Sequence, residues 1–319
     1  MKRLSLEQFR RARRFLKTEA RALDRALFAY RFESAPTSRV TDALAPYQNA
    51  DGGFGHALEP DVRTPSSSAL ATGIGLGILK ELDRPARDPM VSRAAAYLLE
   101  TFDAGKAVWR AVPHDANGYP HAPWWHDEDG SLARTFDGFL VVPRARLVGL
   151  LHHYAELVPE DWLDSVTEET VSAIETLEGE AFGGGGDTLR YALELAETDE
   201  LPQRHKPRLL PRLRDLTERI VSRKPDEWGG YCATPLKIAP SPESAVADAL
   251  RDDLQRNLDY KIEHQTAEGT WEPTWTWGPV YPEAWEEAKR EWRGHLTLET
   301  LTSLRAFGRM DREIETGSR

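Results

Sequence analysis

The chain has 319 residues, and 40% of them are hydrophobic, which is typical of a folded globular protein. It carries 52 acidic and 41 basic residues, and the resulting formal charge of −11 argues against a nucleic acid as its partner. No stretch approaches the roughly 18 apolar residues of a membrane-spanning helix, and a single cysteine excludes an internal disulfide. We therefore expect a cytoplasmic protein, with peripheral membrane contact and the oligomeric state left open.

Helical periodicity begins near the N-terminus, where apolar side chains recur every three or four residues from Leu6 to Phe32. We predict one long helix there, with Ser5 as its N-cap. A short second helix ends at Tyr47. The helices predicted after it span residues 68–81, 88–101, 143–156, 167–177, 189–198, 209–222, 244–264 and 296–307. We expect about ten to twelve helices in total and no strand pairs.

A glycine–aromatic motif recurs in the loops between these helices. Its two fullest copies begin with a glutamine and span residues 48–54 and 265–271, a degenerate copy spans 226–231, and a fourth spans 182–187. Helices that alternate with a recurring loop predict helical hairpins as the repeating unit. The irregular repeat length favours a closed α/α toroid over an open solenoid. We predict an all-α single domain over residues 1–319, with the N-terminal helix packed on the repeats.

The two fullest copies resemble the glutamine–tryptophan repeats of the terpenoid cyclase and protein prenyltransferase superfamily. The residues that carry the resemblance are Gln48, Asp51-Gly52-Gly53-Phe54, Gln265 and Gly269-Thr270-Trp271. The stretch from Gln48 to Leu79, with 121–125, also resembles bacterial proteins of this size identified as prenyltransferase-like. The resemblance implies an α/α toroid in which each glutamine caps the next helix and stacks on the aromatic ring.

Two active-site patterns of that superfamily are absent from the sequence. Class II cyclases carry Asp-x-Asp-Asp, whose middle aspartic acid protonates an alkene, but the nearest segments, 127–130 and 252–253, lack that spacing. Protein prenyltransferases bind zinc through aspartate, cysteine and histidine, and here Gly230 stands two residues before Cys232 in place of the aspartate. The resemblance therefore implies a fold more than a reaction, and we expect no cofactor and no bound metal.

The first candidate site extends the first glycine motif and contains Asp51, Phe54, His56, Glu59 and Asp61. Glycine allows the backbone to fold tightly, so several polar side chains can point into one cavity. Paired carboxylates act as acid and base if burial raises the pKa of one of them. The structural alternative is that Asp51 caps the next helix and that the other two carboxylates bind backbone amides.

The second candidate site concentrates ionisable and aromatic groups between residues 114 and 129. Its predicted ligand contacts are His121, Trp124, Trp125 and His126, and its predicted acids are Asp127 and Asp129. An acid beside two indoles suits carbocation chemistry, because ring faces stabilise a cation, and it equally suits a sugar stacked on tryptophan. A metal site built on the histidines and a solvated turn at 127–129 are the alternatives.

The third candidate site follows the last glycine motif, where Glu272, Trp275 and Trp277 alternate. They are predicted to line the mouth of the toroid, and Tyr231, in the degenerate copy of the motif, is predicted as a further substrate contact. The structural alternative is core packing between the last and first repeats.

These observations favour a protein that binds a prenyl or polycyclic apolar substrate in an aromatic cavity, with acid-initiated carbocation chemistry. Two other classes stay open at this point. One is a carbohydrate-active α/α-barrel protein, such as a glycoside hydrolase or epimerase, that uses paired carboxylates and tryptophan platforms. The other is a non-catalytic binding protein on the same fold. In each case the partner is a small molecule, and whether the protein is an enzyme stays open.

Overall fold

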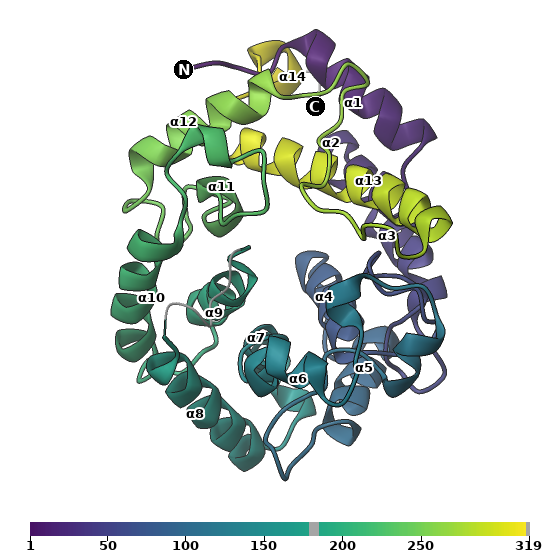
Figure 1. Cartoon of the computed structure of the whole chain (residues 1–319), viewed down its shortest axis with the longest axis vertical. Coiled ribbons are helices and arrows are strands. Elements are labelled where there is room, and N and C mark those ends of the chain that lie inside the picture. Colours follow the sequence, from purple (N-terminus) through teal and green to yellow (C-terminus); the bar gives the residue numbers. More distant parts are fainter. Residues whose placement is uncertain (179–184, 317–319) are drawn as a thin grey trace. The chain divides into compact units, whose positions relative to one another are not determined.

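The computed structural model describes residues 1–178 and 185–316, and the regular secondary structure within them is helical (Figure 1). Strand-like pairing within these residues is limited to isolated bridges, such as Leu4 with Met310 and Val62 with His121. The prediction of an all-α fold is therefore confirmed. The fourth copy of the glycine motif includes residues 182–184, which lie outside the described part of the chain.

The chain divides into two compact units, which we name by their place in the sequence. The terminal unit comprises Met1–Leu44 and Val221–Arg319, and the internal unit comprises Ala45–Ile220. The terminal unit contains α1 (Leu6–Thr18), α2 (Ala22–Glu33), α3 (Thr37–Leu44), α11 (Pro235–Ile238), α12 (Arg251–Glu263), α13 (Pro282–Ala306) and α14 (Arg312–Thr316). The internal unit contains α4 (Ala69–Glu81), α5 (Pro89–Glu100), α6 (Ser131–Thr135), α7 (Arg144–His153), α8 (Glu160–Thr176), α9 (Asp187–Glu197) and α10 (Lys206–Ile220).

The helix predicted over residues 6–32 is two helices, and this corrects the first assignment. Ser5 caps α1 as predicted, with a reciprocal hydrogen-bond pair to Gln8. The helix ends at Thr18, and the chain turns before α2 begins at Ala22. The apolar pattern continues across the turn because both helices contribute to one core, in which Phe9 of α1 contacts Phe28 of α2 at a ring-centroid distance of 6.2 Å.

Three later helices begin seven or more residues away from the predicted start. Helix α8 begins at Glu160 rather than 167, and α12 begins at Arg251 rather than 244. Helix α13 begins at Pro282, well before the predicted 296, with Pro282 at its first position, where a missing N–H is harmless. Its early turns bury Trp285 and Ala288, a stripe too short to stand out among the surrounding charges.

In the internal unit the longer helices pack as hairpins. Helix α7 contacts α4 on one side and α9 on the other, while α5 packs on α4 and α8 on α7. Helix α10 packs against both α8 and α9 (Figure 1). Helix α4 is capped by Ser68, whose side chain accepts a hydrogen bond from the backbone N–H of Ala71. The connection between α5 and α7 is long and irregular, and α6 is a short α-helix within it.

The first glycine motif is a clamp that joins its own loop to α5. The side-chain amide of Gln48 donates to the carbonyl oxygens of Gly52 and Met90, each at 2.9 Å. Gly52 has a φ of +93°, and a Cβ there would collide with the backbone of Arg93. The backbone N–H of Phe54 donates to the hydroxyl of Thr72 at 3.0 Å, which fixes the loop to α4 as well.

The second glycine motif makes the same contacts in the terminal unit. Gln265 donates to the carbonyl oxygens of Gly269 at 3.0 Å and of Gln8, in the first turn of α1, at 3.2 Å. Gly269 has a φ of +91°, and a Cβ there would collide with the backbone of α1. The N–H of Trp271 donates to the hydroxyl of Thr297 on α13 at 3.3 Å. Each glutamine thus binds a first-turn carbonyl of a packed helix, instead of capping the helix that follows its own loop.

Candidate functional site

The first predicted site is largely engaged in holding its own loop. Asp51 accepts hydrogen bonds from the N–H of Gly53 at 3.0 Å and the hydroxyl of Ser67 at 2.7 Å. Phe54 is fully buried, and a Cβ on Gly75 would lie 2.7 Å from its ring. The exposed ring of His56 contacts the side-chain oxygen of Asn49 at 2.8 Å. The structural alternative, in which Asp51 caps the next helix, is therefore wrong: Asp51 stabilises its own loop, and Ser68 caps α4.

A short stretch of paired backbone brings the first and second predicted sites together. The N–H of Ala122 donates to the carbonyl oxygen of Asp61 at 2.8 Å, and the N–H of Arg63 donates to that of Pro120 at 3.0 Å. Asp61 is buried, and Glu59 is half-buried two residues before it. Two segments about sixty residues apart in sequence therefore share one local structure.

Both the carboxylate and the backbone of Asp127 are held by hydrogen bonds. Its carboxylate forms an ion pair with Arg110 at 2.5 Å and accepts from the N–H of Leu132 at 3.1 Å. Its backbone and the side chain of Asn117 exchange two further hydrogen bonds, at 3.0 and 2.7 Å. The hydrogen bond from Arg110 holds the pKa of Asp127 below its usual value. A carboxyl group that is this firmly ionised is poorly suited to protonate a substrate.

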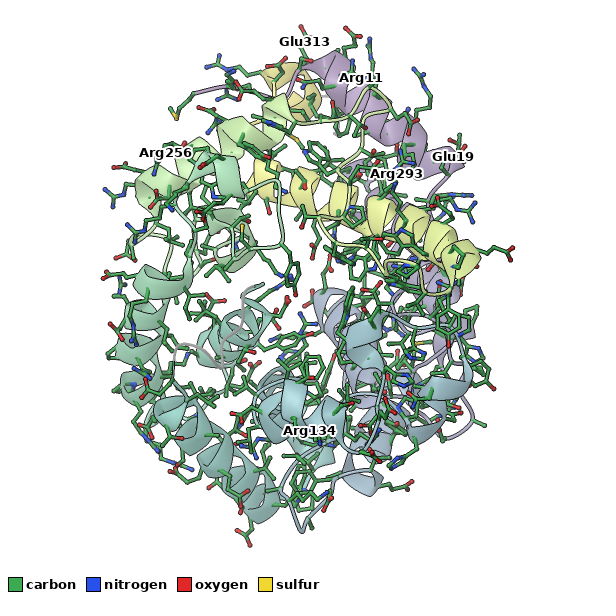
Figure 2. The ribbon with its side chains drawn as sticks, in the orientation of Figure 1. Arg11, Glu19, Arg134, Arg256, Arg293 and Glu313 are labelled. Carbon is green, nitrogen blue, oxygen red and sulfur yellow. The ribbon has the colours of Figure 1, made fainter. Side chains whose placement is uncertain are left out.

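Beside Asp127 the surface forms an open hollow of about 440 Å³, which we call the Trp124 pocket. It is lined by Pro123, Trp124, His126, Glu128, Asp129, Ser131, Arg134 and Thr135. Three residues of the second predicted site, Trp124, His126 and Asp129, therefore lie around one cavity. Arg134, labelled in Figure 2, donates from Nη1 to the carbonyl oxygen of Asp129 at 2.7 Å.

The remaining wall of the Trp124 pocket comes from residues that the sequence did not single out. Ser131 donates from its hydroxyl to the carbonyl oxygen of His126 at 3.2 Å and accepts from the N–H of Glu128 at 2.9 Å. Ser131, Arg134 and Thr135 all belong to α6, whose five residues are too few for a periodic signal. Trp125, in contrast, is buried and stacks on Phe136 at a centroid distance of 4.7 Å.

His121 and His126 form a hydrogen-bonded pair behind the pocket wall. Nε2 of buried His121 lies 3.0 Å from Nδ1 of exposed His126, and Nδ1 of His121 lies 2.6 Å from the carbonyl oxygen of Tyr119. Burial lowers the pKa of His121 below its ordinary value of 6.5, and the neighbouring His126 lowers it further, while hydrogen bonds to backbone carbonyls oppose this. His121 therefore supports the site from within the fold.

The third predicted site lies in the terminal unit and separates into a buried and a half-exposed part. Trp277 is 1% exposed and packs on Trp285, so it belongs to the core. Glu272 lies within ion-pair distance of Lys289, at 3.5 Å, and of Arg293.

Tyr231 and Trp275 instead belong to a row of rings that we call the aromatic face: Tyr231, Trp275, Trp292 and His295. Successive centroids in this row are 6.3, 5.0 and 5.5 Å apart, all edge to face. Tyr231 is 55% exposed, and the Lys237 ammonium lies 5.4 Å from its ring centre.

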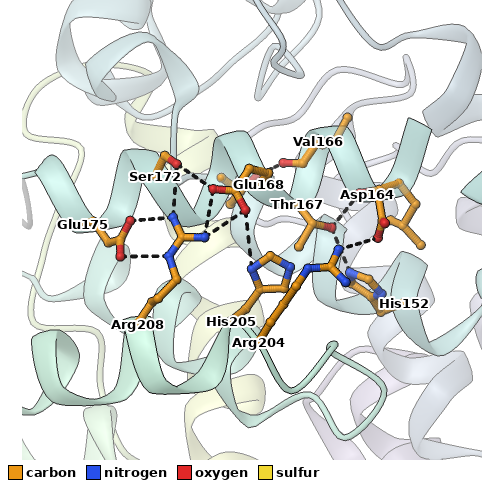
Figure 3. A network of polar contacts seen from close by, with 12 residues as sticks. His152, Asp164, Val166, Thr167, Glu168, Ser172, Glu175, Arg204, His205 and Arg208 are labelled. Carbon is orange, nitrogen blue, oxygen red and sulfur yellow. Dashed lines mark hydrogen bonds and ion pairs between the residues drawn. The ribbon is translucent and has the colours of Figure 1, made fainter. Parts of the chain in front are cut away.

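A second polar cluster, which the sequence did not indicate, lies between α7, α8 and the start of α10 (Figure 3). Nε2 of His152 lies 2.8 Å from the hydroxyl of Thr167, which itself donates to the carbonyl oxygen of Leu163 at 2.6 Å. His205 is fully buried, and within the described residues neither ring nitrogen has a hydrogen-bond partner. The nearest carboxylate oxygen, on Glu168, is 3.8 Å from Nδ1 of His205. Arg208 binds Glu168 and Glu175 on the outer side of this pair.

Burial lowers the pKa of both histidines in this cluster. For His152 the value falls to about 4, with burial as the main cause and the nearby His205 as the second. For His205 burial again comes first, followed by Arg204, while Glu168 opposes the shift. Both rings are therefore neutral near pH 7, and the cluster is a structural feature whose stability depends on pH.

Comparisons with known proteins add no assignment to this geometry. No protein-family model matches the sequence, and no curated protein matches it either. Within the described residues, none of the helices combines the length and the apolar character needed to cross a bilayer. In the same residues, no three or more His, Cys, Asp or Glu side chains are grouped so as to hold a metal ion.

Proposed function

We propose that this chain is a small-molecule-binding protein whose ligand is a hydroxylated ring compound, of the saccharide type, held in the Trp124 pocket. The observation that carries the proposal is the lining of that pocket. The half-exposed indole of Trp124 lies among hydrogen-bond donors and acceptors, which include His126, Glu128, Asp129 and Arg134. A sugar presents apolar C–H groups on the face of its ring and hydroxyls around its edge, so it matches both kinds of group.

The polar lining favours this ligand over a prenyl chain at the same place. Six of the eight lining residues have polar or charged side chains: His126, Glu128, Asp129, Ser131, Arg134 and Thr135. Binding of an apolar chain would gain about 25 cal/mol per Å² of buried apolar surface. It would also remove water from these polar groups, and the chain has no group that could form the hydrogen bonds lost with that water. Hydroxyls replace those hydrogen bonds.

Calorimetric titration of the whole chain with maltotriose and with cellotriose tests the proposal. We expect binding by one of the two and an affinity about two- to tenfold weaker in Trp124→Ala, because an aromatic contact contributes about 0.5–1.5 kcal/mol. Trp124→Phe keeps a ring and should retain most of the affinity. Tyr231→Ala, which removes an exposed aromatic ring from the terminal unit, is the matched control. Equal affinities in the wild-type and Trp124→Ala proteins would overturn the proposal.

A prenyl ligand is the second candidate, and the aromatic face of the terminal unit favours it. Rows of edge-to-face rings offer apolar area together with the negative ring faces that stabilise cations. Titration with geranylgeranyl diphosphate tests it, with Trp275→Ala as the variant expected to lose affinity. Prenyl binding that survives Trp275→Ala would count against this second candidate.

We further propose that the hairpins close into an α/α toroid of the kind found in the terpenoid cyclase superfamily. What supports it is the agreement of the two clamps, since Gln48 and Gln265 bind equivalent carbonyl oxygens and Gly52 and Gly269 share one backbone conformation. Agreement contact by contact is expected of true structural repeats. A crystal structure in which the hairpins stack in an open row would contradict the toroid.

A further inference from the structure

The His121–His126 pair determines which nitrogen of His126 is available to the Trp124 pocket. A carbonyl oxygen can only accept, so Nδ1 of His121 carries the proton that it donates to Tyr119 at 2.6 Å. Burial keeps His121 neutral, and its Nε2 therefore bears a lone pair. Nδ1 of His126, 3.0 Å away, must donate to that lone pair.

A neutral His126 that donates from Nδ1 has its accepting lone pair on Nε2. This atom lies across the ring from the bond to His121, and the side chain is exposed and lines the pocket. The arrangement follows the general rule that the partner of one imidazole nitrogen fixes the protonation of the other. Two hydrogen bonds within the fold thus orient one basic nitrogen at the surface.

Building on the proposed function, we infer that Nε2 of His126 is the acceptor for a ligand hydroxyl in the Trp124 pocket, with His121 as its positioning residue. The charged groups around it are Glu128, Asp129 and Arg134, which line the same pocket, and the carboxylate of Asp127, which is paired with Arg110. Protonation of His126 converts Nε2 from an acceptor into a donor. Ligand affinity therefore falls on acidification.

Nitrogen-15 spectra of the histidine rings in the ligand-free protein test the inference directly. We expect His121 and His126 both to carry their proton on Nδ1 near pH 8. His121→Phe keeps a ring but removes the acceptor, so His126 should lose its preference for Nδ1–H, and His121→Gln should restore it by offering an amide oxygen. A proton on Nε2 of His126 in the wild-type protein, or an unchanged tautomer in His121→Phe, would overturn the inference.

Titration with maltotriose or cellotriose between pH 8 and pH 5 gives the second measurement. Affinity should fall progressively as the pH is lowered from 8 to 5, because each bound ligand excludes one proton. A flat profile, with saccharide still bound, would overturn the role of His126 and leave the proposed function standing. Failure of every saccharide to bind, with both rings in the expected tautomer, would instead remove the proposed function and leave the pairing intact.

Discussion

Acid should destabilise the internal unit through the two buried histidines of Figure 3, and His152 allows the size of the effect to be worked out. Its pKa is 6.5 in an ordinary setting and about 4 in the fold, so the unfolded chain binds its proton first. The contribution of neutral His152 to the free energy of unfolding is present above pH 6.5 and is lost as the pH falls from 6.5 to 4. From these two values, linkage gives a loss of about 2 kcal/mol between pH 7 and pH 5. His205 adds to it with the same sign.

The assay is urea unfolding followed by tryptophan fluorescence at pH 7 and pH 5, for the wild-type protein and for His152→Gln. The glutamine amide keeps a donor for the hydroxyl of Thr167 and does not titrate. We expect the wild-type protein to lose about 2 kcal/mol more than the variant between the two pH values. Groups that do not interact with His152 titrate alike in both proteins, so they cancel in the difference.

His153→Gln is the control for this comparison, because His153 is the next residue on α7 yet is only half-buried and contacts Glu200 at 2.6 Å. This variant keeps His152, so it should still lose the stability of about 2 kcal/mol that His152 accounts for between pH 7 and pH 5. Parallel pH profiles for the wild-type protein and His152→Gln would refute the reasoning, since they would mean that His152 binds its proton equally well in both states.

Two further predictions concern the clamps. Gly52→Ala and Gly269→Ala should each lower the free energy of unfolding by about 3 kcal/mol, because the added Cβ is strained at positive φ and collides with helix backbone. Gly118 has open space around it and serves as the control. Gly118→Ala should change the free energy of unfolding by less than about 1 kcal/mol in the same urea titration. Gln48→Ala and Gln265→Ala should each cost about 1–3 kcal/mol, measured in the same way, because each leaves two carbonyl oxygens without their donor. A large loss in one glutamine variant and none in the other would show that the two clamps are not equivalent.

The sequence predicts the helices well where local signals are sufficient. Ser5 and Ser68 mark helix starts, and the repeated glutamine–glycine loop identifies two equivalent structures far apart in the chain. The break between α1 and α2 escapes detection because one apolar stripe runs across it. The early start of α13 at Pro282 escapes detection because its first turns are mostly charged.

The candidate site is harder to predict because local sequence does not show burial. Neighbouring Trp124 and Trp125 look alike in sequence, yet one lines the pocket and the other packs on Phe136. The ionised state of Asp127 depends on Arg110, seventeen residues earlier, which no local motif connects to it. Partners that folding brings together from a distance decide which acids and rings remain available.

The clamp on α1 has a consequence for the order in which the protein assembles during synthesis. Gln265 binds the first turn of α1, and the backbone of Leu4 pairs with that of Arg309 and Asp311. The terminal unit therefore needs residues from both ends of the chain, whereas the internal unit is one continuous segment. On a ribosome the internal unit can fold while α1 still waits for its partners, and the final contacts close a loop of more than two hundred residues. We expect nascent chains that stop before residue 265 to leave α1 open to proteases or chaperones.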